Sequence, residues 1–126
     1  MKIALLWPVY LPDLSAGSVR CDAFAKNLTR LGNEVSVITP SQSLGHETVE
    51  TNSYEVRRIS SYYALSKSLG YGAALLSFPV SLRKIRKAIS EIHPDLVIAS
   101  TPGPILAFEG FLATRQMNVP FVFDVR

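Results

Sequence analysis

The most chemically suggestive stretch of the sequence is a short run of small and hydroxyl residues near the N-terminus. The run consists of Ser15, Ala16, Gly17 and Ser18, which follow an apolar segment and precede a helical pattern. Backbone amides at the start of a helix favour an anion such as a phosphate, and Arg20 adds a charged fork. The two serines could instead only cap the helix, because a cap and an anion site use the same atoms. Both interpretations stay open at this point.

Two further groups of polar side chains follow later apolar runs. Ser100 and Thr101 come directly after residues 96–99, on a turn that neighbouring prolines stiffen. Turns of this composition often only start a helix. Asp124 and Arg126 end the last apolar run, where a local ion pair is the structural alternative to a binding role. We predict that these side chains contribute to one ligand site.

Several common catalytic motifs are missing from the sequence. It has no G-x-G-x-x-G dinucleotide motif, no Walker loop and no G-x-S-x-G elbow. His93 and Ser100 cannot be paired into a triad from sequence, and His46 with Glu47 fits a solvated loop better than an acid/base pair. A single cysteine excludes an internal disulfide and a cysteine-based zinc site. We predict neither a metal nor a cofactor, and the catalytic residues stay unknown.

The first forty residues predict a strand, a loop, a helix and a second strand. An apolar run at residues 3–7 indicates a strand that is buried on both faces, and prolines end it. The helix is expected from Ser18, with an apolar stripe at Cys21, Phe24, Leu28 and Leu31. A second apolar run at residues 35–38 indicates the next strand.

The rest of the chain continues the alternation of strands and helices. Residues 41–53 are polar and predict an exposed loop, and residues 61–78 are weakly helical. A cleaner helix is expected to begin at Pro79. The further expected elements are strands at residues 54–59, 96–100 and 121–125 and a helix at residues 105–116. The alternation predicts an α/β fold with a Rossmann-like, doubly wound parallel sheet of strand order 3-2-1-4-5. The candidate segments would then meet where strands one and four lie side by side.

Composition and charge restrict the classes of partner. A chain of 126 residues with 48% hydrophobic residues is expected to form one domain. A formal charge of +3 is too mild for a nucleic-acid binder, so no nucleic-acid partner is predicted. No apolar run reaches the roughly 18 residues of a membrane span. The chain is therefore expected to be soluble or peripheral to a membrane.

One expected helix carries a cluster of basic residues. The cluster consists of Arg83, Lys84, Arg86 and Lys87. A solvated helix surface is the plain interpretation. The apolar segment at residues 62–78 lies beside it, however, and basic charge next to apolar surface is typical of proteins that meet an anionic bilayer. We predict that the four basic residues face a membrane.

Two blocks of the chain resemble glycosyltransferase family 4 enzymes of the GT-B fold. Residues 2–40 are similar to the start of that family: a strand, a proline-containing loop, a glycine turn, an arginine-bearing helix and a strand that ends in Thr. Residues 93–126, with HPDLVIASTPGP and FVFDVR, are similar to the later part of its N-terminal domain. Ala16 replaces the first glycine of the turn, and Asn33 stands where a histidine is common.

The resemblance implies a retaining transfer of a sugar from a nucleotide-sugar to an acceptor. In the family the glycine turn approaches the donor diphosphate, a role that maps to Ser15, Ala16 and Gly17 with Arg20 nearby. The front domain holds the acceptor, so the acceptor-side residues are expected to be Ser100, Thr101, Asp124 and Arg126. The acceptor would be a sugar or a lipid-linked sugar, in cell-surface polysaccharide or glycolipid synthesis. The expected location is the cytoplasm, at the inner face of the membrane.

We expect residues 1–126 to be the N-terminal domain of a longer protein, because the last apolar run ends abruptly. The donor-binding domain of the family is then missing from this sequence, and the 126 residues alone would be inactive. Two alternatives remain open. One is a nucleotide-sugar epimerase of the same fold, and the other is a non-catalytic α/β binding module.

Overall fold

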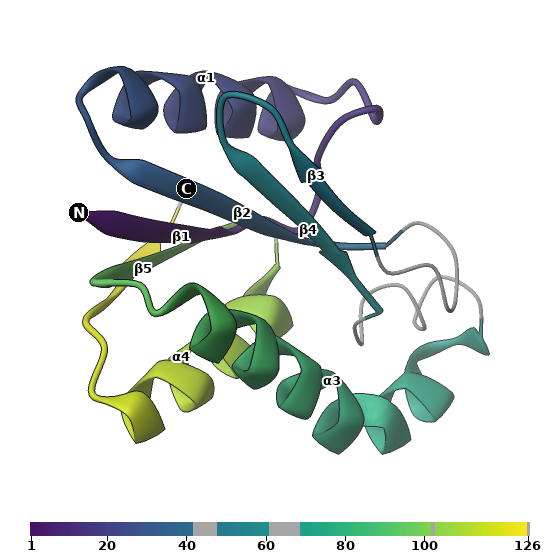
Figure 1. Cartoon of the computed structure of the whole chain (residues 1–126). Helices are drawn as coiled ribbons and strands as arrows, with labels where there is room; N and C mark the ends of the chain where they lie inside the picture. Colours follow the sequence, from purple (N-terminus) through teal and green to yellow (C-terminus); the bar gives the residue numbers. More distant parts are fainter. Residues whose placement is uncertain (42–47, 61–68, 102, 126) are drawn as a thin grey trace.

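The fold is a six-stranded sheet with helices on both faces (Figure 1). The computed structural model describes residues 1–41, 48–60, 69–101 and 103–125. The strands lie in the order β3-β4-β2-β1-β5-β6, and all neighbours run parallel except β3, which pairs antiparallel with β4. The elements are β1 (Lys2–Leu6), α1 (Ala16–Arg30), β2 (Glu34–Pro40), β3 (Thr48–Thr51), β4 (Glu55–Ile59), α3 (Tyr71–Ile92), β5 (Leu96–Ser100), α4 (Pro104–Met117) and β6 (Phe121–Asp124).

The predicted strand order is confirmed for the five expected strands, which lie in the order β4, β2, β1, β5 and β6. The sheet differs from the prediction at one edge, where residues 48–51 form β3 instead of part of an exposed loop. All four side chains of β3 are exposed, so its sequence lacks the alternation of apolar and polar residues that predicts a half-buried strand. Backbone pairing with β4 holds it, with Thr48 opposite Arg58 and Thr51 opposite Glu55. His46 and Glu47 lie outside the described residues.

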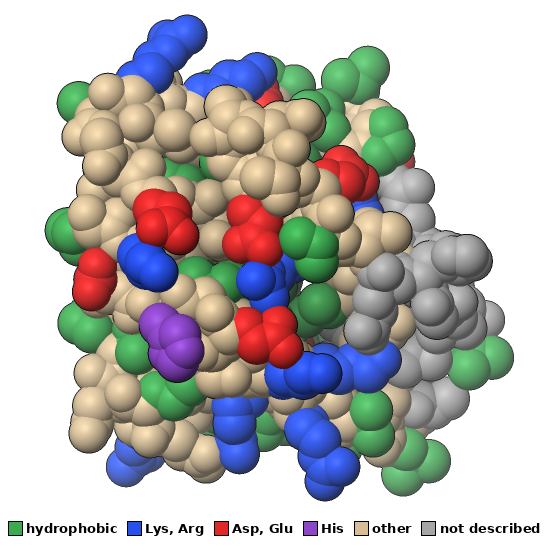
Figure 2. Space-filling model, viewed as in Figure 1, with side chains coloured by type: hydrophobic (Ala, Val, Ile, Leu, Met, Phe, Trp, Pro, Cys, Tyr) green, Lys and Arg blue, Asp and Glu red, His purple; other side chains and the backbone are tan. Residues whose placement is uncertain are grey.

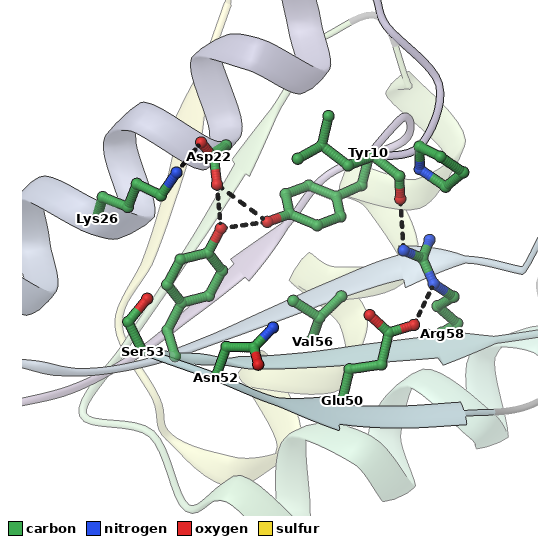
Figure 3. A pocket seen from close by; sticks show the side chains of 11 residues that line it. Tyr10, Asp22, Lys26, Glu50, Asn52, Ser53, Val56 and Arg58 are labelled. Atoms are coloured by element: carbon green, nitrogen blue, oxygen red, sulfur yellow. Dashed lines mark hydrogen bonds and ion pairs between the residues drawn. The ribbon is translucent and has the colours of Figure 1, made fainter.

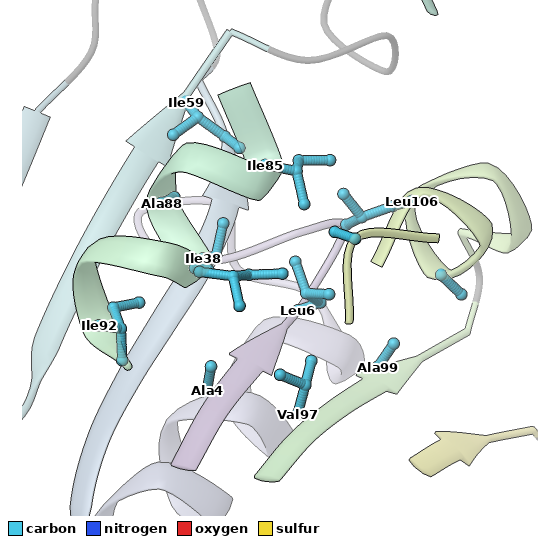
Figure 4. Close-up of a cluster of buried hydrophobic side chains, with 13 residues drawn as sticks. Ala4, Leu6, Ile38, Ile59, Ile85, Ala88, Ile92, Val97, Ala99 and Leu106 are labelled. Carbon is cyan, nitrogen blue, oxygen red and sulfur yellow. The ribbon is translucent and has the colours of Figure 1, made fainter. Parts of the chain in front are cut away.

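The central strand β1 is buried on both faces, which explains its unbroken apolar sequence. Successive side chains of a strand point to opposite faces. Ala4 and Leu6 face α3 and α4 and join the cluster that Figure 4 shows. Ile3, Leu5 and Trp7 point to the other face, where they pack with residues of α1. One strand therefore supplies the middle of both hydrophobic cores.

Helix α1 begins two residues earlier than the sequence predicts, at Ala16. Its predicted apolar stripe is only partly buried: Cys21 is inaccessible, whereas Phe24 and Leu31 are exposed. Burial, the largest cause, raises the pKa of the Cys21 thiol, which keeps the thiol protonated and unreactive. Cys21 thus serves as a small core residue.

The prediction that a helix begins at Pro79 is wrong, because α3 begins earlier. The helix starts at Tyr71 and passes through Pro79, whose fixed φ fits helical backbone although the residue donates no amide hydrogen bond. Its second half buries Ile85, Ile89 and Ile92 against the sheet. The first half leaves large apolar side chains such as Leu75 and Leu76 in solvent.

An ionisable side chain is buried between α3 and α4. Glu109 on α4 is only 1% exposed, and a hydrogen bond with Ser81 of α3 stabilises its charged form. Within the described part of the chain, the Glu109 Oε1 atom has no hydrogen-bond partner. Burial outweighs the hydrogen bond and raises the pKa of Glu109 to about 7.

This buried carboxyl should make folding stability depend on pH. Below the unfolded pKa of 4.5 the residue is protonated in both states. Between that value and about 7 the unfolded chain releases the proton while the folded chain keeps it, so stability falls as pH rises and then levels off. The free energy of unfolding should fall by up to about 3 kcal/mol across this pH range. Glu109→Gln should abolish this loss and be more stable than the parent protein at about pH 8.

Urea unfolding across the pH range measures the effect as the difference between variant and parent. Glu34→Gln is the matched control, because the Glu34 side chain is 70% exposed. Parallel stability curves for the parent and Glu109→Gln would contradict the assignment.

Candidate functional site

The candidate site lies at the carboxyl ends of β1, β5 and β6. Strands β1 and β5 are parallel neighbours, and the helices that follow them, α1 and α4, cover opposite faces of the sheet (Figure 1). In open α/β sheets such a switch point opens a crevice where ligands bind. The predicted convergence of the loops after β1 and β5 with the end of β6 is therefore present.

One carboxylate joins three of the predicted segments. The Asp124 side chain, at the end of β6, forms an ion pair with the guanidinium of Arg20 on α1. The Ser100 hydroxyl, at the end of β5, donates a hydrogen bond to the same Asp124 Oδ2 atom at 3.1 Å. The Arg20 and Asp124 side chains are 33% and 28% exposed, so the pair is partly shielded from solvent. We call these three residues the switch-point junction.

Trp7 fixes the start of α1 beside this junction. Its ring nitrogen Nε1 donates a hydrogen bond to the Gly17 carbonyl at 3.0 Å. The Arg20 guanidinium lies over the Trp7 ring, 5.5 Å from its centroid, where a cation is favoured. Trp7 is 2% exposed and belongs to the core, so a rigid residue holds both the helix start and the arginine.

The loops after β1 and β5 also pack directly against each other. A Cβ atom added at Gly103 would lie 2.9 Å from Pro8 Cβ, closer than side chains approach. Gly103 lies in the loop between β5 and α4, and Pro8 follows β1. Glycine is thus needed for the close contact between the two loops.

Ser15 and Ser18 form a capping box at the start of α1. The Ser18 amide donates to Ser15 Oγ at 3.1 Å, and the Ser15 amide donates to Ser18 Oγ at 2.9 Å. The capping interpretation is therefore confirmed for both hydroxyls. The amides of Ala16 and Gly17 occupy the first helical positions, which have no intrahelical acceptor. Anion binding by these amides stays a prediction.

The other predicted acceptor-side residues differ in accessibility. Ser100 is 1% exposed, and its hydroxyl contacts Asp124. Thr101 is half-buried and donates its amide to the Asp124 carbonyl at 3.3 Å. Arg126 lies outside the described residues. His93 ends α3 before β5 begins, whereas Ser100 ends β5, so the strand separates the two and they form no catalytic pair.

The family model of Glycosyltransferase Family 4 matches residues 17–125, nearly the whole chain. This chain belongs to Glycosyltransferase Family 4. The match includes Arg20, Ser100 and Asp124, so the switch-point junction lies within the matched region. Among the curated proteins, none matches the sequence.

Solved structures share the fold of this family 4 chain at low sequence identity. Sucrose-phosphate synthase from Thermosynechococcus elongatus superposes with a TM-score of 0.74 at 11% identity, over 97% of this chain and 32% of its own. Os79 from O. sativa, solved in complex with UDP, gives 0.65 at 14% identity, over 95% of this chain and 28% of its own. The chain thus spans less than a third of the length of each structure, and it shares with them a Rossmann-like α/β fold of the GT-B type.

The same fold also occurs in a protein that is named as a hydrogenase. The C-terminal domain of a hydrogenase from Pyrococcus furiosus superposes with a TM-score of 0.62 at 18% identity, over 98% of this chain and 89% of that domain. At such identities the likeness shows the fold alone. The family match, and not the fold, therefore indicates a glycosyltransferase.

The basic cluster of this family 4 chain is less uniform than predicted. Arg83 and Lys87 are exposed, but Lys84 and Arg86 are half-buried. Lys87 lies 3.9 Å from the carboxylate of Glu91, one helical turn away. Figure 2 shows Lys and Arg side chains, in blue, over the region of α3. Only part of the cluster is thus free to face a flat surface.

The first half of α3 adds exposed apolar side chains to that surface. Leu75, Leu76 and Val80 are 64%, 85% and 57% exposed. None of the helices in the described ranges is long and apolar enough to span a membrane.

Sequence patterns missed a polar pocket on the α1 face. It has a volume of about 440 Å³ and lies between α1, the loop after β1 and the β3–β4 hairpin (Figure 3). Tyr10 and Tyr54 meet there through their hydroxyls although 44 positions separate them in the sequence. The spacing of residues within one segment could not predict this pocket, because its walls come from segments that are distant in the sequence.

Proposed function

We propose that this chain is the N-terminal, acceptor-side domain of a retaining glycosyltransferase. The enzyme would move a sugar from a nucleotide-sugar to a sugar or lipid-linked acceptor, in cell-surface polysaccharide or glycolipid synthesis in the cytoplasm. A donor-binding domain beyond this sequence would complete the cleft. Family membership and the switch-point junction support the proposal, because the junction brings the start of α1 and the ends of β5 and β6 to one crevice.

The proposed roles combine the resemblance to the family with the geometry of the loops. The Ala16 and Gly17 amides and the Arg20 guanidinium would approach the donor diphosphate, since they combine a helix dipole with a charged donor. Ser15 supports this loop as the helix cap. Thr101 and Asp124 would face the acceptor, and buried Ser100 would orient Asp124. Arg126, outside the described residues, is proposed for the same edge.

The alternatives are weaker on the same observations. An epimerase acting on nucleotide-sugars should carry charged side chains in the first loop, and residues 15–18 have none. A binding module without catalysis is compatible with the fold, which a hydrogenase domain shares. The assay below separates it from a transferase.

Sugar transfer by the product of the complete gene tests the proposal. With UDP- and GDP-sugars the full-length protein should transfer a sugar to an acceptor, whereas the purified 126-residue chain should transfer none. Arg20→Ala should lower kcat/KM about 10- to 100-fold, the cost of losing a hydrogen bond to a charged group. The matched control is Arg30→Ala, at the exposed end of the same helix, which should leave transfer unchanged.

Each contrary result is informative. Transfer by the 126-residue chain would refute the division into two domains. A complete gene product of 126 residues that is stable and inactive would favour the binding module.

We further propose that the exposed side chains of α3 between Leu75 and Lys87 rest on an anionic membrane at its cytoplasmic face. Leu75, Leu76 and Val80 would enter the headgroup boundary, and Arg83 and Lys87 would contact anionic lipid. Half-buried Lys84 and Arg86 would contribute less. Such a surface would bring a lipid-linked acceptor to the crevice.

Sedimentation with vesicles tests the membrane proposal. At low salt the chain should sediment with vesicles that contain phosphatidylserine. It should not sediment with vesicles of phosphatidylcholine alone. Each Lys or Arg near the surface contributes about 1 kcal/mol, so Arg83→Glu with Lys87→Glu should weaken retention at least about tenfold. Arg30→Glu with Arg115→Glu, which reverses two exposed charges on α1 and α4, is the control with an equal change in net charge. Failure of anionic vesicles to retain the chain would remove the proposal.

A further inference from the structure

The polar pocket on the α1 face has features that the proposed catalytic crevice does not use. It is built from three separate segments: the loop after β1, the middle of α1 and the β3–β4 hairpin (Figure 3). Its volume of about 440 Å³ lies within the range of small-molecule sites. Its charged and aromatic lining residues are Tyr10, Asp22, Lys26, Glu50, Tyr54 and Arg58.

The charged side chains of the pocket neutralise one another. Lys26 Nζ lies 2.7 Å from Asp22 Oδ2, and Arg58 Nε lies 3.3 Å from Glu50 Oε1. These two pairs are all the charged residues in the lining, so the pocket has no net formal charge. An anionic ligand would meet two carboxylates, and a cationic ligand would meet two bases. The pocket therefore suits a ligand without charge.

A rigid hydrogen-bond network forms one wall. The hydroxyls of Tyr10 and Tyr54 contact each other, and both contact Asp22 Oδ1. Burial is the largest cause that raises the pKa of both tyrosines, so both hydroxyls stay protonated at neutral pH. Burial opposes ionisation of Asp22, but hydrogen bonds and the Lys26 charge outweigh it and lower the pKa of the carboxyl. The wall is thus preorganised with a fixed protonation state.

Arg58 fixes the other side of the pocket. Its guanidinium donates to the Leu11 carbonyl and lies over the Tyr10 ring, 5.8 Å from the centroid. The loop after β1 is thereby tied to β4. Because this loop also leads into Ala16 and Gly17, the pocket and the switch-point crevice share one segment of backbone.

The remaining lining offers hydrogen-bonding groups above an apolar floor. Asn52 and Ser53 are exposed at the hairpin turn, and Val56 of β4 lies between the polar residues. An amide, a hydroxyl and an ammonium with spare protons can serve several donor and acceptor groups at once. A polyhydroxylated ring with one C–H face matches this combination.

We propose that the α1-face pocket binds a neutral sugar unit. In the setting of the proposed function, on which this last step rests, the unit belongs to an acceptor glycan and lies away from its reacting end. The shared loop between β1 and α1 would link occupancy of the pocket to the crevice.

Amide NMR spectra of the 126-residue chain test the proposal with neutral probes. The probes are the methyl glycosides of glucose, galactose, mannose and N-acetylglucosamine, each added up to about 100 mM, because one sugar unit is expected to bind in the millimolar range. At least one glycoside should cause saturable shifts at Asn52, Ser53, Tyr54 and Lys26. Inorganic phosphate and UDP should cause none at these positions.

Three variants identify the site. Asn52→Ala should weaken the binding of the glycoside at least threefold, because it removes an amide from the lining. Thr51→Ala alters the neighbouring exposed residue, which does not line the pocket, and should leave binding unchanged. Ser53→Trp should fill the pocket and abolish binding, with a spectrum that stays dispersed as a check on folding.

The outcomes separate this proposal from the proposed function. Absence of saturable shifts with every glycoside overturns the sugar site, whatever the full-length protein catalyses. Shifts at the pocket with phosphate or UDP also overturn it, since they would show an anion site. Glycoside binding that Asn52→Ala weakens supports the site, even where the full-length protein transfers no sugar.

Discussion

The candidate site depends on the ion pair between Arg20 and Asp124. These residues lie 104 positions apart, one on the first helix and one at the end of the last strand. The parallel sheet brings β1, β5 and β6 side by side, and the ion pair then joins the loops that leave their carboxyl ends. Ser100 donates to the same carboxylate, and Trp7 holds the arginine and the start of α1. A partly shielded charge pair is stronger than one in open solvent, so it can fix the crevice.

Most of the fold could be predicted because strands that are buried on both faces have continuous apolar sequences. Strand β1 shows an unbroken apolar run for this reason, and the alternation with helices sets the order of the parallel strands. The predictions of secondary structure are wrong where the local sequence pattern does not indicate the element that forms. β3 is fully exposed and held by backbone pairing, and α3 extends before Pro79 to Tyr71, where Phe78 stacks on Phe108 of α4. In both cases tertiary contacts decide what propensity leaves open.

The site was predictable as a set of segments but not as a set of contacts. Topology places the residues after β1 and β5 and at the end of β6 together, and their resemblance to the family agrees with the family match. Sequence could not show that Ser100 is buried against Asp124, or that Ser15 and Ser18 use their hydroxyls on each other. The α1-face pocket left no signal, because Tyr10, Asp22 and Tyr54 meet only in the folded chain.

A double-mutant cycle on Arg20 and Asp124 tests the central claim most directly. Urea unfolding of the parent chain, Arg20→Ala, Asp124→Ala and the double variant gives the coupling energy of the pair. We expect a stabilising coupling of about 1 kcal/mol for this pair, and a value near zero for the more exposed Lys2–Glu34 pair, whose charges lie 3.8 Å apart. If the Arg20–Asp124 coupling is as small as that of the control pair, the ion pair does not join the loops and the account of the site is wrong.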